Sequence, residues 1–312
     1  MVALRWKRSK PRLTRKADQL LLCCLAWALV TSCATRSHGQ VVYSNSFDQH
    51  RSARLYTAQD LDSDWNEPVW NNGVEQGRVS LVTGAKAYGG SGSSLAISYP
   101  AKQRGSQESG AQWQLKLSGE HEELYSSYRV KFKNGFDFVR GGKLPGLAGG
   151  TAPTGSDVAN GNTGWTARMM WRTNFKGKSG EPQQPTSQVI SYAQYANSGS
   201  DKNGANEDKE YWMRSRLNRV KLKSGVWYQV TQRIKLNDPG VSNGIIQIWL
   251  DREQVLDQSG MLFRTTPDLK IDKLYFSTFF GGGSAWASSK AETIYFDDFI
   301  ITKSKPAVGL HR

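Results

Sequence analysis

A lysine and two arginines lie close together in the middle third of this 312-residue sequence, in segments that could bind an anion. Lys143 stands in the string GGKLPGL, where glycines and a proline hold the backbone in a defined, crowded turn beside the ammonium group. Residues 165–172 alternate, so that Arg168 and Arg172 share one face of a predicted strand. A guanidinium group can hold a carboxylate through paired hydrogen bonds. These residue types therefore indicate a site for a carboxylate.

The next predicted strand, residues 188–195, offers a group for proton transfer. Tyr192 and Gln194 alternate onto one face of this strand, and Tyr195 falls nominally on the opposite face. A phenol near a basic cluster can have its pKa lowered and so take part in proton transfer. Arginines on the solvent face of a strand and packed tyrosines are also common, and the periodicity does not decide between these interpretations.

The residue sets of other familiar enzymes are missing from the sequence. Its four histidines form no H-x-x-x-H or Cys/His cluster that would suggest a zinc site. No G-x-S-x-G elbow, Walker loop or Rossmann fingerprint stands between a predicted strand and a predicted helix. Residues 281–283, three glycines, follow a strand but precede no predicted helix, so we interpret them as a close-packed turn. We expect neither a metal ion nor a cofactor.

The elements that must position these side chains are predicted to be strands. In residues 227–236 apolar side chains alternate with polar ones, which is typical of a half-buried strand. Turn residues separate such segments, and no long amphipathic helix follows the N-terminal region. We therefore predict an all-β, concanavalin-like jelly-roll β-sandwich. The same pattern recurs at 128–132, 244–250, 274–280 and 294–301.

Three polar stretches are too long for simple hairpin turns, namely residues 148–163, 174–187 and 196–210. Long loops in a compact domain are usually either the walls of a functional site or surface insertions. The sequence leaves both possibilities open for each stretch.

The N-terminal region has the pattern of a targeting segment. Seven Lys and Arg residues precede the apolar run from Leu20 to Val30, which is too short to span a bilayer. Cys33 ends the string VTSC, which resembles a lipobox whose cysteine would carry a lipid anchor; cleavage elsewhere before residue 41 is the alternative. We predict a signal or lipoprotein-type targeting segment over 1–40 and one domain over 41–312. The protein would be secreted, periplasmic or lipid-anchored at the cell surface.

Basic charge belongs to the predicted domain itself. The chain has a formal net charge of +14, and residues 1–33 hold seven basic residues and one acid, so the remainder carries +8. All three cysteines also lie within residues 1–33, so the domain has no disulfide. A basic exported protein suggests an anionic partner, and polysaccharide, nucleic acid and membrane lipid all satisfy the charge.

A series of strings resembles polysaccharide lyase family fourteen, the alginate and glucuronan lyases, in order from about Val41 to Lys303; the family-twenty glucuronan lyases share similar strings. GGKLPGL is the most specific of them. The resemblance implies a β-jelly roll whose concave sheet forms a cleft, with no required metal. The strings are FDFVRGGKLPGLAGG, GWTARMMWR, SYAQY, GVWYQVTQRIKLND, GIIQIWLD, FSTFFGGG and IYFDDF.

The resemblance also implies roles for individual residues. Lys143 matches the family's essential lysine, and Thr166-Ala167-Arg168 matches its Ser-x-Arg with a changed hydroxyl residue. The family's Tyr-x-Tyr pair is broken here, because Gln194 replaces the second tyrosine unless a bulge brings Tyr195 to the cleft. The implied catalytic residues are Lys143, Arg168, Tyr192 and Tyr195, and the implied substrate-binding residues are Thr166, Arg172 and Gln194.

The chemistry implied is β-elimination from a uronate. The site must neutralise the carboxylate, remove the C5 proton and protonate the departing glycosidic oxygen. Arg168 would neutralise the carboxylate, with Thr166 and Gln194 as hydrogen-bonding helpers. Either Lys143 or Tyr192 would take the proton while the other donates one. Their reference pKa values of about 10.4 and about 10 would have to be lowered, and nearby arginines would lower that of the lysine.

Three other functions compete with a lyase. A non-catalytic carbohydrate-binding module would use the same face if Gln194 has abolished turnover. A glycoside hydrolase would need two carboxylates facing one cleft, and the pairs available are Glu207-Asp208 and Asp297-Asp298. Nucleic-acid binding fits the charge, but no nucleic-acid motif is present. We expect an anionic polysaccharide partner, alginate before glucuronan, no nucleic acid, and a monomer.

Overall fold

The computed structural model describes residues 40–155, 157–173, 185–196, 212–213 and 220–309, together with Val2. Residues 38–312 form one compact unit. The predicted targeting segment falls almost wholly outside the described residues, so it stays a prediction. Most of the predicted loops at 174–187 and 196–210 also lies outside them, but residues 186 and 187 belong to a strand rather than to a loop. No helix in the described part of the chain is long and apolar enough to cross a membrane.

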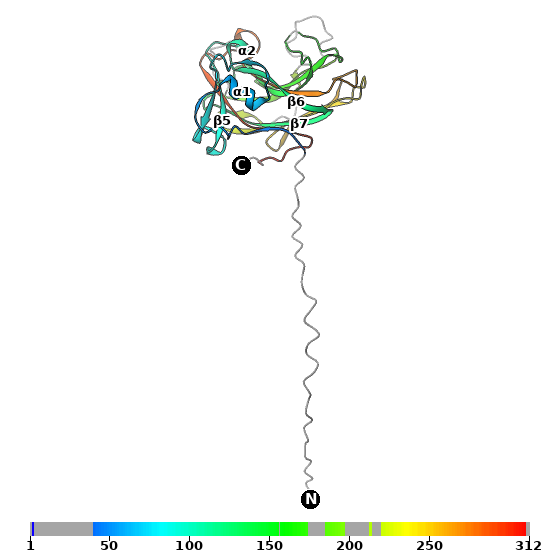
Figure 1. The fold of residues 1–312 in the computed structure, drawn as a ribbon, viewed down its shortest axis with the longest axis horizontal. Helices are drawn as coiled ribbons and strands as arrows, with labels where there is room; N and C mark the ends of the chain where they lie inside the picture. The colour runs from blue at the N-terminus through cyan, green and yellow to red at the C-terminus, as the bar shows by residue number, and fades with distance from the viewer. Residues whose placement is uncertain are drawn as a thin grey trace. The chain divides into compact units, whose positions relative to one another are not determined.

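Two antiparallel sheets make up the described domain, and Figure 1 shows β6 of one sheet above β7 of the other. The first has nine strands in the order β15-β14-β13-β7-β17-β5-β4-β2, with β1 also paired to β17. Its strands are β1 Val41–Asn45, β2 Arg54–Leu55, β4 Val79–Thr83, β5 Ser93–Tyr99, β7 Glu123–Phe132, β13 Trp227–Lys235, β14 Gly244–Leu250, β15 Glu253–Met261 and β17 Glu292–Thr302.

The second sheet has eight strands in the order β11-β10-β9-β8-β16-β6-β3, with β12 also paired to β10. Its strands are β3 Val69–Asn72, β6 Ala111–His121, β8 Gly141–Gly150, β9 Gly164–Arg172, β10 Thr186–Gln194, β11 Trp212–Met213, β12 Leu222–Lys223 and β16 Ile271–Thr278. Short helices lie between strands: α1 Ala58–Trp65, α2 Gly105–Glu108 and the 3-10 turns Gly84–Lys86, Tyr88–Gly90 and Ser284–Trp286. The all-β prediction is confirmed.

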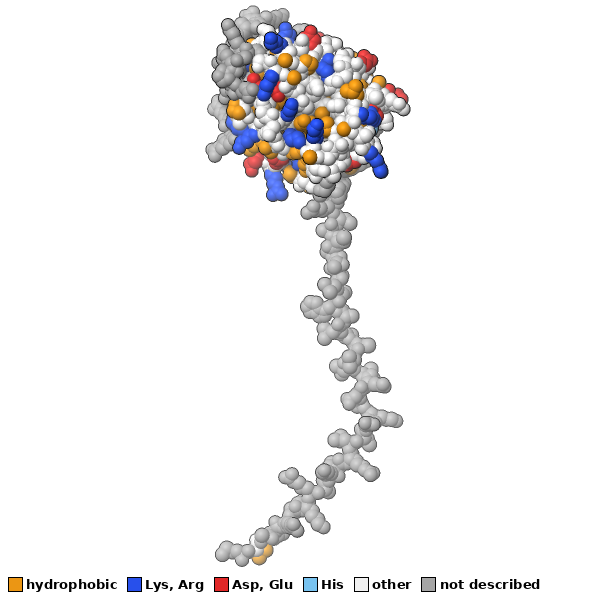
Figure 2. All heavy atoms as spheres, turned by 90° about the vertical axis from the view of Figure 1, so that its left-hand side faces the viewer, with side chains coloured by type: hydrophobic (Ala, Val, Ile, Leu, Met, Phe, Trp, Pro, Cys, Tyr) orange, Lys and Arg blue, Asp and Glu red, His pale blue; other side chains and the backbone are white. Residues whose placement is uncertain are grey.

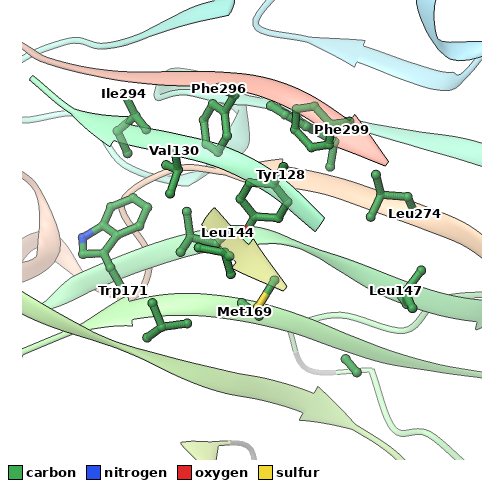
Figure 3. Packing of buried hydrophobic residues seen from close by; sticks show 14 of the residues in the cluster. Tyr128, Val130, Leu144, Leu147, Met169, Trp171, Leu274, Ile294, Phe296 and Phe299 are labelled. Carbon is green, nitrogen blue, oxygen red and sulfur yellow. The ribbon is translucent and has the colours of Figure 1, made fainter. Parts of the chain in front are cut away.

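The core forms between the sheets because alternate side chains of each strand point inward. Figure 3 shows Tyr128, Val130 and Phe296 of the first sheet facing Leu144 and Trp171 of the second. All of these side chains are buried. Strands with this period must turn their other face outward, and on the second sheet that outer face carries the predicted site.

The basic charge expected from the composition is spread over the surface. Figure 2 shows Lys and Arg side chains scattered across one face of the molecule, with hydrophobic side chains between them. Asp and Glu side chains also appear on this face, so it carries charges of both signs.

Candidate active site

Strand pairing in the second sheet brings the predicted residues together. Lys143 on β8 is opposite Met170 on β9, and Tyr192 on β10 is opposite Arg168 on β9. The alternation predicted for 165–172 is confirmed, since the intervening Trp165, Ala167, Met169 and Trp171 all belong to the core. We call the opposite side of this sheet the site face; it is defined by Lys143, Arg168, Tyr192 and Tyr275.

The side chain of Lys143 lies against the ring of Tyr192 and the thioether of Met170. Its Nζ lies 2.9 Å from the ring centroid of Tyr192 and 3.3 Å from the sulfur of Met170. The side chain is 8% exposed. Burial, followed by repulsion from Arg168 and Arg172, holds the pKa of the lysine well below its usual value. Part of the Lys143 population is therefore neutral, and can accept a proton, at a lower pH than for a lysine in water.

The glycines around Lys143 are required by close packing. A Cβ atom on Gly142 would lie 2.2 Å from the ring of Trp171, which fills the core beneath it. A Cβ atom on Gly146 would lie 2.4 Å from the backbone oxygen of Ala167. Strand β8 also shifts register against β9 between Leu144 and Leu147. The string GGKLPGL thus encodes a bulged strand that lies tightly against its neighbour.

Arg168 is a buried cation with no acidic partner among the described residues. It is 2% exposed, its Nη1 donates to the hydroxyl of Ser277 at 3.1 Å, and its Nε has no hydrogen-bond partner. The guanidinium carbon lies 4.7 Å from the ring centroid of Tyr275 and 5.4 Å from that of Tyr192. Burial lowers the pKa of Arg168, and the two tyrosines oppose that shift. Among the residues described, neither Arg168 nor Lys143 forms an ion pair.

Arg172 lies farther along the same face. Its guanidinium carbon lies 4.5 Å from the ring centroid of Trp286, and its Nη1 donates to the backbone oxygen of Arg140 at 2.7 Å. Trp286 packs with Met170 and Ile190, so it covers one end of the site face. The predicted turn at residues 281–283 positions this tryptophan, since a Cβ on Gly282 would lie 2.3 Å from the indole nitrogen.

Two predicted substrate-binding side chains are used to hold a loop. Thr166 donates its hydroxyl to the backbone oxygen of Pro153 at 3.1 Å. Gln194, opposite Thr166 in register, donates its amide to the oxygens of Gly155 and Asp157 at 3.0 and 3.2 Å. Both side chains are fully buried. These hydrogen bonds fix the segment that follows β8, and the substrate-binding role of the two side chains stays a prediction.

The structure does not bring Tyr195 to the site face. The β9–β10 register runs without a shift from Gln188 to Gln194, so no bulge turns the following residue over. Tyr195 instead packs against the main core, with its ring centroid 6.4 Å from that of Phe263. The placement follows from strand alternation, and it leaves Tyr192 as the tyrosine beside Lys143.

The sequence did not predict two residues of the site face. Tyr275 and Ser277 alternate along β16 and contact Arg168 from the side opposite Tyr192. Burial raises the pKa of Tyr275, and Arg168 partly offsets this effect. The period-2 pattern of β16 was visible in the sequence. Its pairing with β8, through Tyr275 opposite Gly146, was not.

The two described carboxylates considered for hydrolysis lie away from this site. Asp297 and Asp298 belong to β17 in the other sheet, where Asp297 is buried and accepts a hydrogen bond from the hydroxyl of Ser94. Glu207 and Asp208 lie outside the described residues. Among the described residues, no group of three or more His, Cys, Asp or Glu side chains could hold a metal ion.

Replacing Lys143 with methionine is expected to stabilise the folded protein by on the order of 2 kcal/mol near neutral pH, because a buried amine no longer has to lose its proton or its hydration. The folded pKa of Lys143 lies below the unfolded value of about 10.4, so the wild-type penalty is complete below the folded pKa and disappears as pH approaches about 10.4. Urea unfolding of both proteins at several pH values measures this difference. A gain that grows with pH would contradict the assignment.

This chain resembles known polysaccharide lyases in both sequence and fold. The sequence profile described as polysaccharide lyase 14 matches residues 88–299. The alginate lyase Aly36B aligns with a TM-score of 0.66 and 22% identity, covering 84% of this chain and 97% of that one. Variants of it were solved with an alginate tetrasaccharide and an alginate trisaccharide.

Two further solved structures share the fold. The alginate lyase of Aplysia kurodai aligns with a TM-score of 0.63 and 21% identity, over 85% of this chain and all of that one. The alginate lyase vAL-1 from Chlorella virus aligns with a TM-score of 0.59 and 20% identity, over 83% of this chain and all of that one. At these identities the likeness establishes a common fold. No curated protein sequence matches the chain.

Proposed function

This chain belongs to polysaccharide lyase family 14, and from that premise we propose that it cleaves alginate, a chain of uronate sugars, by β-elimination. The observation that carries the proposal is the buried cation Arg168 beside the buried amine of Lys143 on the site face, with no ion-pairing carboxylate for either group among the residues described. Buried charges without partners are costly, and a uronate carboxylate would supply the missing partner. The alginate oligosaccharides bound to variants of Aly36B support the choice of polymer.

We assign the substrate carboxylate to Arg168. Its only described hydrogen-bond acceptor is the hydroxyl of Ser277, and its buried Nε has none among the described residues, so a bound carboxylate would supply a missing acceptor. The flanking rings of Tyr192 and Tyr275 keep the planar group in place. Pairing the carboxylate lowers the cost of the negative charge that develops when the C5 proton leaves.

We assign proton abstraction to Lys143, because its lowered pKa provides a neutral amine. The C5 proton moves to Nζ of Lys143. The electrons of the broken C5–H bond form the C4–C5 double bond, and the bond between C4 and the glycosidic oxygen breaks. Tyr192 donates its phenolic proton to the departing oxygen. The Lys143 ammonium then releases its proton to solvent and the Tyr192 phenolate takes one up from solvent, which restores both groups.

The experiment that tests the function uses the protein incubated with alginate, glucuronan and hyaluronan. Each double bond formed adds ultraviolet absorbance, and we expect absorbance to rise with alginate. The rate should increase as pH rises through the pKa of Lys143, because only the neutral amine accepts the proton. Binding of all three polymers is measured in parallel. Binding without any new absorbance would identify a carbohydrate-binding protein and overturn the lyase proposal.

A further inference from the structure

Trp70 exposes an aromatic side chain on a strand that shares the sheet of the active site. It is 46% exposed, and it is the one aromatic residue among the large hydrophobic side chains exposed in the described part of the chain. It belongs to β3, the last strand of the eight-stranded sheet on the side of β6 and β16. Residue 70 also precedes the segment that matches the family profile, 88–299.

The backbone at Trp70 is unfavourable for a tryptophan. Val69 pairs with Gln114 and Asn72 with Gln112, so β3 has one extra residue between these pairs and forms a bulge. Within the bulge Trp70 has φ +69°, a left-handed conformation that glycine adopts without strain and bulky side chains avoid. A strained residue that is kept at a bulge beside a catalytic face suggests a functional side chain.

The indole ring extends the aromatic surface of the site. Its centroid lies 5.8 Å from that of Tyr275, at an interplanar angle of 50°. Tyr275 is 1% exposed, and the guanidinium carbon of Arg168 lies 4.7 Å from its ring centroid. The side chains of Arg168, Tyr275 and Trp70 are therefore in contact in this order. The ring of Tyr275 is buried, whereas the ring of Trp70 is exposed at the edge of the sheet.

We propose that Trp70 is a sugar-stacking subsite for the same uronate chain, beyond the sugar held by Arg168. The C–H face of a pyranose ring is apolar and packs on an indole face, while its hydroxyl and carboxylate groups stay in water. The tilted contact with Tyr275 holds the indole ring against the sheet. The subsite rests on the proposed function for the identity of its ligand, and it adds affinity for long chains rather than chemistry.

The test compares the wild type with Trp70→Gly and Trp70→Phe, on polymeric alginate and on the shortest oligosaccharide that the enzyme cleaves. We expect Trp70→Gly to raise KM for the polymer about tenfold, with kcat and the KM for the short substrate unchanged. Trp70→Phe should keep most of the affinity. The melting temperature of Trp70→Gly should be equal to or above that of the wild type, because glycine relaxes the left-handed backbone. Val226→Ala, at another exposed hydrophobic residue, is the matched control.

The subsite is overturned if the polymer KM does not change, or if activity on both substrates falls together with the melting temperature. To separate this outcome from failure of the lyase proposal, polymer binding is measured for Lys143→Met with and without Trp70→Gly. Weaker binding without Trp70 supports the subsite even if no protein shows turnover. Equal binding, or no binding of alginate by any variant, overturns it.

Discussion

Lys143→Met is expected to lower kcat on alginate by about 10³-fold or more, because the change removes the base. Methionine has a similar unbranched length and fits beside Met170, so packing is kept. The rate of absorbance increase at saturating alginate measures the loss. The variant should at the same time be more stable than the wild type near neutral pH, and loss of activity by unfolding is thereby distinguished from loss of the amine.

The matched control is Lys290→Met. The half-exposed Lys290 pairs with Glu292 at 3.6 Å and contacts none of the four residues that define the site face, so its replacement tests the effect of removing one positive charge from a basic protein. We expect its kcat to stay within about twofold of wild type. Lys143→Met with more than a tenth of wild-type kcat would show that the amine is not the base, and Tyr192 would then be the remaining candidate.

Arg168→Lys is expected to lower kcat/KM by about 10²- to 10³-fold, although it keeps the positive charge. A lysine cannot reproduce the planar fork that pairs with a carboxylate, and it would lose both the Ser277 hydrogen bond and the guanidinium contacts with the rings of Tyr192 and Tyr275. Initial rates over a range of alginate concentrations give the value. The loss should be found in kcat as well as KM, because the arginine neutralises charge that grows in the transition state.

Ser277→Ala separates the charge of Arg168 from its positioning. It removes the one hydrogen bond described for the guanidinium and leaves the cation in place. We expect a loss of about tenfold in kcat/KM, well below that of Arg168→Lys. Equal losses for the two variants would mean that orientation alone accounts for the arginine, whereas an Arg168→Lys enzyme with wild-type kcat/KM would remove it from the site.

The sequence by itself determined which face each strand residue occupies. Alternation placed Arg168 and Arg172 together, put Tyr192 on the matching face of the next strand, and assigned Tyr195 to the opposite side unless a bulge intervened. The glycines and proline of GGKLPGL indicated close packing, which the ring of Trp171 against Gly142 confirms, but they predicted a turn where the structure has strand β8. These features are local, because the two-residue period and the space left by a glycine are properties of the chain over a few residues.

Only the tertiary structure decided which strands are neighbours and what covers them. Tyr275 contacts Arg168 because β16 pairs with β8. This pairing joins segments more than a hundred residues apart in the sequence, and no local pattern predicts it. Burial of Lys143, and with it the lowered pKa, depends on Met170, Tyr192 and the glycine turn at 281–283.

For Thr166 and Gln194, the sequence predicted the face of the strand but not the hydrogen-bond partners. Their positions on the site face followed from alternation, but their hydrogen bonds go to a loop whose path the sequence left open. The bulge that exposes Trp70 likewise results from its register against β6. Register, long-range pairing and burial are set by the packing of the whole sandwich, and that is why they could not be obtained one segment at a time.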